Sequence, residues 1–156
     1  HLNSQNHKID PFLVKGVIHQ ESMFDAKSLS PAGARGLMQL MPETGRRLSA
    51  EEQISFTADA LFNPEVNIQL GVKYLSELIR QTGNNAAHVL ICYNAGPDAL
   101  KRWLKQFEDL KDPDEFLESI PFQETRIYVR RVLRNYGIYK YLYPNGAEDR
   151  RRDDLF

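Results

Sequence analysis

The chain has 156 residues, of which 42% are hydrophobic and 26% are charged, and its formal net charge is −1 at pH 7. This length favours a single domain that buries about 70% of its unfolded surface. Because 20 basic residues balance 21 acidic ones, the composition argues against a binder of nucleic acid or of an anionic membrane. No apolar stretch approaches the roughly 20 residues that span a bilayer. The single cysteine, Cys92, excludes a disulfide within the chain and lies in an apolar run typical of a buried side chain.

The first helix is predicted close to the start of the chain. Asp10 and Pro11 have the residue types of an N-cap and a first helical position, and the pattern continues to about Ser22. The apolar residues expected to face the core here are Ile9, Phe12, Leu13 and Val17. Further on, residues 48–62 have only weak periodicity, which indicates a short helix and a loop.

A second long helix is predicted over residues 64–82. Asn63 and Pro64 repeat the starting signal, and Gly83 provides the stop. Its inward stripe is expected to consist of Ile68, Val72, Leu75 and Ile79.

Three more helices are expected in the second half of the chain. An apolar helix over about 85–94 ends before Gly96, and Pro97 opens the next one, with apolar residues Leu100, Trp103, Leu104 and Phe107 at helical spacing. The last helix is expected over about 121–142. Its inward residues are expected to be Phe122, Val129, Val132, Leu133 and Tyr136.

The whole pattern predicts an all-α fold. No long run alternates with a period of two, as a half-buried strand would. Asp112, Asp114 and Glu115 are interpreted as an acidic turn between helices, without the glycine and terminal glutamate of a calcium loop. The helices are therefore expected to pack around one core.

Glu21 is the most informative polar residue. Steps of four back along the chain reach Val17, Leu13 and Ile9, so the carboxyl group continues the stripe that faces the core. Burial disfavours the charged form and raises the pKa of a carboxyl group. An acid that keeps its proton near neutral pH can donate it to a leaving group. The pattern therefore indicates that Glu21 is a catalytic acid.

Four sequence blocks together resemble one enzyme family. They are ES at 21–22, GLMQLMP at 36–42, YNAGP at 93–97 and ESIPFQETRIYV at 118–129. Their order and spacing over residues 8–143 resemble the lytic transglycosylase family (SLT domain), most closely the C-terminal catalytic domain of soluble lytic murein transglycosylases. The resemblance implies a lysozyme-like single helical domain over this range. The segment 1–7 is expected to be flexible, and 144–156 is expected to be a charged, solvated tail.

The resemblance implies a particular reaction on peptidoglycan. The β-1,4 bond between N-acetylmuramic acid and N-acetylglucosamine is cleaved without water, and a 1,6-anhydro ring is left. Most glycosidases use two carboxyl groups, whereas here Glu21 is implied to act alone, first as acid and then as base, with help from the substrate N-acetyl group. No cofactor is implied, and the histidine and acidic residues show no metal-binding motif.

Five further residues match substrate-binding positions of the family. Ser30 is expected to hold the substrate acetamido group, although a serine before proline is also ordinary turn chemistry. Gln39 and Met41 are expected on a short helical segment that lines the sugar groove. Tyr93 is expected beside the acid, where its hydroxyl could bind the carboxylate or the substrate; the alternative is a buried tyrosine with a satisfied hydroxyl. Glu118 is the best second carboxylate, with a binding role implied.

Two alternative functions stay open. One is a lysozyme-like hydrolase that uses water and a second acid such as Asp25 or Glu118. The other is a peptidoglycan-binding module without catalysis. Glu124 and Arg126 are interpreted as members of surface or inter-helix pairs and not as catalytic groups.

The expected partner is the glycan strand of peptidoglycan with its stem peptides, bound by a monomer. The expected location is the periplasm or cell envelope of a bacterium. Because the chain opens at His1, it is interpreted as a fragment that lacks its export signal.

Overall fold

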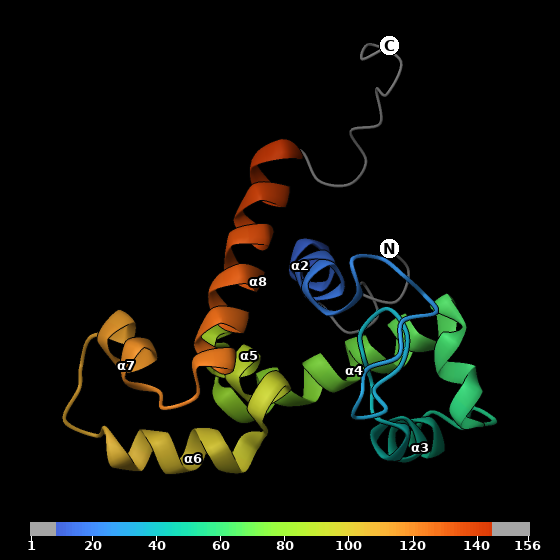
Figure 1. Cartoon of the computed structure of the whole chain (residues 1–156), viewed down its shortest axis with the longest axis horizontal. Coiled ribbons are helices and arrows are strands. Elements are labelled where there is room, and N and C mark those ends of the chain that lie inside the picture. The colour runs from blue at the N-terminus through green and yellow to red at the C-terminus, as the bar shows by residue number, and fades with distance from the viewer. Residues whose placement is uncertain (1–8, 145–156) are drawn as a thin grey trace.

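Figure 1 shows the computed structural model of the chain, in which residues 9–144 are described. Within this range the elements are α2 (Pro11–Ser22), α3 (Pro42–Glu51), the 3₁₀ helix η1 (Ala58–Phe62), α4 (Pro64–Thr82), α5 (Ala86–Ala95), α6 (Pro97–Gln106), α7 (Pro113–Ser119) and α8 (Gln123–Leu142). Between residues 9 and 144, strand-like pairing is limited to isolated bridges. The all-α prediction is therefore confirmed. The expectations for residues 1–7 and for the tail after Pro144 lie outside the described residues.

Side-chain caps start the helices where the sequence predicts them. The Asp10 carboxylate accepts a hydrogen bond from the Phe12 N–H at 2.9 Å at the start of α2, and Asn63 caps α4 in the same way. Gly83 ends α4 in the left-handed region, with φ of 68°. Asp112 caps α7, a helix that the sequence pattern did not predict, and Asp114 and Glu115 lie in its first turn.

The main core lies where α2 packs against α8 and α5 packs against α4, α6 and α8 (Figure 1). Helices α2 and α8 approach each other closely at Gly16, where an added Cβ would lie 3.1 Å from the carbonyl oxygen of Val132. The small residue therefore lets the two helix backbones come together. This contact matters for function because α2 ends at Glu21 and Ser22.

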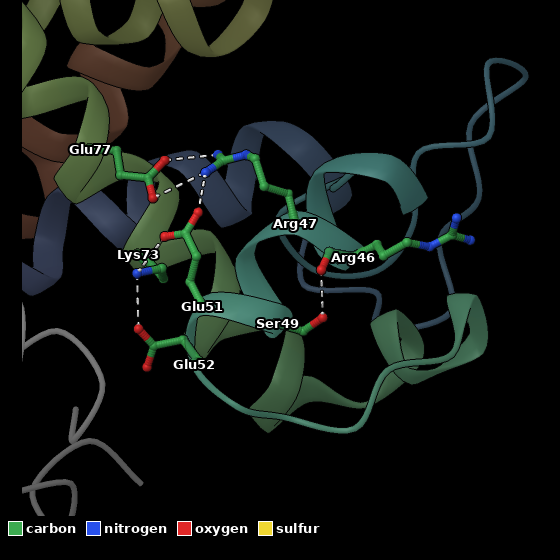
Figure 2. A network of polar contacts seen from close by, with 7 residues as sticks. All are labelled: Arg46, Arg47, Ser49, Glu51, Glu52, Lys73 and Glu77. Carbon is green, nitrogen blue, oxygen red and sulfur yellow. Dashed lines mark hydrogen bonds and ion pairs between the residues drawn. The ribbon is translucent and has the colours of Figure 1, made fainter.

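A second, smaller core joins α3 and η1 to α4. Its fully or nearly fully buried residues are Leu40, Leu48, Leu61 and Leu70. At the surface of this unit, charged side chains bridge the helices (Figure 2). Arg47 of α3 pairs with Glu77 of α4 at 2.8 Å and with Glu51 at 2.9 Å, while Lys73 of α4 pairs with Glu51 and Glu52. Both the small core and this network fix α3, which directly follows the predicted substrate loop.

Phe122, which was expected inside the protein, and Leu104, which shares the apolar spacing of α6, both lie at the surface. Leu104 is 40% exposed, because its neighbour Trp103 takes the inward position on α6 and the next residue is turned by about 100°. Phe122 is 55% exposed, because it precedes α8 as its N-cap and does not belong to the inward stripe of that helix. Val129 and Val132 are buried as expected.

Candidate active site

The carboxyl group of Glu21 lies in the last turn of α2 and is largely buried. Its Oε1 accepts a hydrogen bond from the Tyr128 hydroxyl of α8 at 2.8 Å. Burial raises the pKa of Glu21 to about 7; the Tyr128 hydrogen bond lowers it and the nearby charge of Glu124 raises it further. The group is therefore poised to hold a proton or to release one at neutral pH.

The chain leaves α2 through two residues in unusual backbone conformations. Met23 and Phe24 have φ values of 52° and 66°, in the left-handed region that disfavours large side chains. Both side chains are exposed. Strain of this kind persists where the surroundings over-determine the backbone, which is common beside functional groups.

Ser22 connects the end of α2 to the loop before α3. Its hydroxyl lies 2.8 Å from the carbonyl oxygen of Leu37 and 3.2 Å from that of Ile18. One hydroxyl hydrogen is therefore shared between the helix and the loop. This contact explains why a serine follows the acid, since it fixes the acid relative to residues 36–41.

The loop itself is anchored by a buried amide. Asn67 of α4 is fully buried, accepts from the Met38 N–H at 2.8 Å, and donates to the carbonyl oxygens of Arg35 and Leu61. Gly36 has φ of 74°, and an added Cβ would lie 2.1 Å from the Leu61 carbonyl oxygen. Only glycine fits there, so the loop has a single well-defined path.

Tyr93 of α5 closes the inner side of this region. Its hydroxyl donates to the Met38 carbonyl oxygen at 2.8 Å, and not to the carboxylate of Glu21. Burial raises the pKa of Tyr93, and the charge of Glu21 raises it further. The next residue, Asn94, accepts a hydrogen bond from Thr125 of α8 at 2.8 Å. Helices α5 and α8 are thereby joined beside the acid.

The structure places Ser30 and Gln39 on the loop that follows α2. Ser30 closes a turn, in which its Oγ accepts from the Ala34 N–H at 3.0 Å. The Gln39 side-chain N–H group donates to the carbonyl oxygens of Ser28 and Gly36. Each side chain thus stabilises the loop. The Ser30 hydroxyl can still donate a hydrogen bond, and the Gln39 side-chain oxygen can still accept one.

The short helical segment predicted around Gln39 and Met41 was wrong. Gln39 has φ of 48°, and Met41 is extended because it precedes Pro42, which begins α3. Met41 is 43% exposed, so its side chain is available to a ligand. Its neighbour Met38 is fully buried and packs against Gly71, where an added Cβ would lie 2.3 Å from the Met38 sulfur.

The structure does not bring Glu118 to Glu21. Glu118 is exposed, lies on α7, and forms an ion pair with Arg130 of α8. Arg130 lies two residues after Tyr128, about 200° around the helix from it. Glu118 therefore pairs with the opposite face of α8 from the one that meets Glu21, and Figure 1 shows α7 and α2 on opposite sides of α8.

Tyr128 and Glu124 lie in the block 118–129 that carries the family resemblance, but neither was predicted to act on Glu21. They are four residues apart and therefore share a face of α8. Glu124, interpreted from the sequence as a member of a surface or inter-helix pair, is exposed, and its charge raises the pKa of Glu21. The available signal for Tyr128 was its place on a buried stripe, where a hydroxyl needs a partner.

Within residues 9–144, no group of three or more His, Cys, Asp or Glu side chains could hold a metal ion. None of the helices in this range is long and apolar enough to cross a membrane.

Comparison with known proteins gives consistent matches. The family model described as the transglycosylase SLT domain matches residues 2–116. The soluble lytic murein transglycosylase of Escherichia coli K12 is 40% identical over 127 residues, which is 80% of this chain and 20% of that protein.

Solved structures agree with this match. An inactive glutamate-to-glutamine mutant of the lytic transglycosylase Slt from Pseudomonas aeruginosa is 35% identical, with a TM-score of 0.84 over 92% of this chain and 24% of that one. A 70-kDa soluble lytic transglycosylase in complex with bulgecin A is 36% identical, with a TM-score of 0.85 over 89% of this chain and 23% of that one. The lysozyme-like architecture is thereby confirmed. The chain spans between a fifth and a quarter of the length of these relatives.

Proposed function

The chain belongs to the transglycosylase SLT domain family, and from this we propose that it cleaves the glycan strands of peptidoglycan as a lytic transglycosylase. The observation that carries the proposal is the single carboxyl group of Glu21, largely buried, with one tyrosine donor and a pKa of about 7. The same observation favours an enzyme over a binding module, because binding alone needs no buried acid poised to exchange a proton.

In the first step Glu21 donates its proton to the glycosidic oxygen between N-acetylmuramic acid and N-acetylglucosamine. Since Oε1 already accepts from Tyr128, we place the transferable proton on Oε2. As the bond to the leaving oxygen breaks, the acetamido oxygen of the substrate attacks the anomeric carbon and forms an oxazolinium ring. The loop that carries Ser30 would orient this acetamido group.

In the second step the Glu21 carboxylate removes the proton from the 6-hydroxyl of the same sugar. The freed oxygen attacks the anomeric carbon, the bond to the acetamido oxygen breaks, and a 1,6-anhydro ring forms. A group with a pKa of about 7 suits both steps, because neither protonation state is strongly disfavoured at neutral pH.

A lysozyme-like hydrolase would need a second acid near the anomeric carbon. The candidates Asp25 and Glu118 are both exposed. Asp25 accepts the Lys27 N–H in a local turn, and Glu118 pairs with Arg130. Neither arrangement favours direct catalysis, so we propose that the substrate supplies its own nucleophile.

The relatives named above come from bacteria, and we propose that this chain acts in the bacterial cell envelope, where peptidoglycan is found. The glutamate-to-glutamine change that inactivates the Pseudomonas relative suggests the matching experiment. Mass spectrometry of digested peptidoglycan should find muropeptides with anhydro ends, lighter by one water than reducing ends, and Glu21→Gln should release none. Reducing ends alone would point to a hydrolase, and unchanged release by Glu21→Gln would exclude Glu21 as the acid.

A further inference from the structure

Phe122 is a large aromatic residue that the fold holds in place while 55% of it faces solvent. A single exposed apolar side chain is common and needs no explanation. The way this ring is mounted is less common. Its centroid lies 5.3 Å from that of Trp103, with the planes at 77°, which is an edge-to-face contact. Trp103 of α6 is itself only 4% exposed, so the exposed ring rests on a buried one.

The backbone around Phe122 is braced on both sides. Ile120 is fully buried, and the guanidinium of Arg126 donates to the Ile120 carbonyl oxygen. The Arg126 backbone N–H donates to the Phe122 carbonyl oxygen at 3.1 Å. The ring is therefore pre-organised, and a ligand that covers it loses little entropy in ordering it.

Phe122 is the N-cap of α8, which packs against α2, the helix whose last turn carries Glu21. Tyr128, which binds Glu21, follows six residues later, so the two positions are roughly 9 Å apart along α8 at about 1.5 Å per residue. An added Cβ at Gly96, where α6 begins, would meet nothing within 4 Å. Open space therefore adjoins the start of the helix that carries Trp103.

We propose that Phe122 is a stacking platform for a sugar ring of the glycan strand, beyond the sugar on which Glu21 acts. This inference rests on the proposed function. The C–H groups on one side of a pyranose ring are apolar and fit an aromatic face, as in other binding sites lined by aromatic residues. The carboxylate of Glu124, two residues further on, repels an anionic stem peptide but not an uncharged N-acetyl sugar.

The sequence provides its own reporter for this test, since Trp103 is the only tryptophan in the chain. Binding is measured with the Glu21→Gln variant, so that the ligand is not cleaved. The ligands are β-1,4-linked N-acetylglucosamine oligomers from dimer to hexamer, which carry no stem peptide. Binding of the longer oligomers should change the emission of Trp103. In this background, Phe122→Ala should weaken hexamer binding about tenfold in calorimetry, as expected for uncovering much of a phenyl ring.

Two variants serve as controls. Phe122→Tyr retains the ring and should bind the hexamer like the parent. Tyr141→Ala removes an 84% exposed aromatic ring near the other end of α8 and should leave hexamer binding unchanged. Since both Phe122 and Tyr141 are exposed, thermal unfolding of each variant should remain close to that of the parent.

The outcomes separate this inference from the proposed function. A protein that releases anhydro-terminated muropeptides, yet binds the hexamer equally well with and without the Phe122 ring, would overturn the platform alone. A loss of affinity confined to peptide-bearing strands would assign the ring to the stem peptide and also overturn it. A protein that neither releases anhydro ends nor binds the hexamer would overturn both.

Discussion

Replacing Tyr128 by phenylalanine removes the hydroxyl that donates to Glu21 and retains the ring in the core. In the native protein this hydrogen bond lowers the pKa of Glu21 against the larger effect of burial, and the result is about 7. A hydrogen bond to a charged group contributes about 1.5–3 kcal/mol, and one pKa unit corresponds to about 1.4 kcal/mol. Protonated Glu21 also accepts this bond, so the lower end of that energy range applies, and the pKa of Glu21 in Tyr128→Phe should rise to roughly 8.

The measurement is the pH dependence of kcat/KM for release of soluble muropeptides, between roughly pH 5 and pH 9. Activity requires protonated Glu21 in the first step, so it should decline as the pH rises through about 7 in the native enzyme. In Tyr128→Phe the decline should shift upward by about one pH unit.

Tyr136→Phe is the matched control, since Tyr136 is also on α8 and its hydroxyl donates to a carboxylate, that of Asp10, at 2.8 Å. Its profile should match that of the native enzyme. An alkaline limb in Tyr128→Phe that stays in place or shifts to lower pH would refute the assignment of Tyr128 as the donor that tunes Glu21.

The other predictions concern stability. Glu21 has a pKa of about 7 in the folded protein, against an ordinary value of 4.5, so the free energy of unfolding should fall as the pH rises through this interval. Glu21→Gln should therefore stabilise the domain by up to ~3 kcal/mol at pH 8 but not at pH 4, as measured by urea denaturation. Asn67→Ala should destabilise the domain by about 3 kcal/mol, because two buried backbone groups and one partly buried group lose their partner. A loss below about 1 kcal/mol would contradict this role. Arg47→Ala should lower the free energy of unfolding by about 1 kcal/mol in low salt. The control is Arg46→Ala, which should change it little, because the Arg46 side chain points away from the network in Figure 2. Equal effects of the two substitutions would contradict a contribution of the ion pairs.

Helix positions were predictable because their signals are local. The pairs Asp10–Pro11 and Asn63–Pro64 start helices where expected, and in both the side chain accepts a backbone N–H of the first turn. Gly83 ends α4 because a left-handed conformation without a side chain costs little there. Such signals depend on a few neighbouring residues, so they can be read without the fold.

The burial of Glu21 was also predictable, but its surroundings were not. The stripe that leads to Glu21 predicts its burial and its raised pKa, which the structure confirms. Its donor, Tyr128, is 107 residues away in sequence, and no local pattern reveals which tyrosine meets the acid when α2 packs against α8. The family pattern drew attention to Tyr93, whose hydroxyl instead binds the Met38 carbonyl oxygen.

The error around Gln39 has a simpler cause. The apolar spacing of Leu37, Met38, Leu40 and Met41 resembles a helix, but Met38 and Leu40 are buried in two different cores. A proline at position 42 forces the residue before it out of the helical region.

The attachment of Asn67 to the loop has a consequence for how the domain responds to heating. The amide that fixes the loop and the sulfur of Met38 are interior groups, and Ser22 ties the same loop to the helix of the acid. Opening the site would therefore require disrupting the interior, so heat should abolish catalysis and melt the domain in one step.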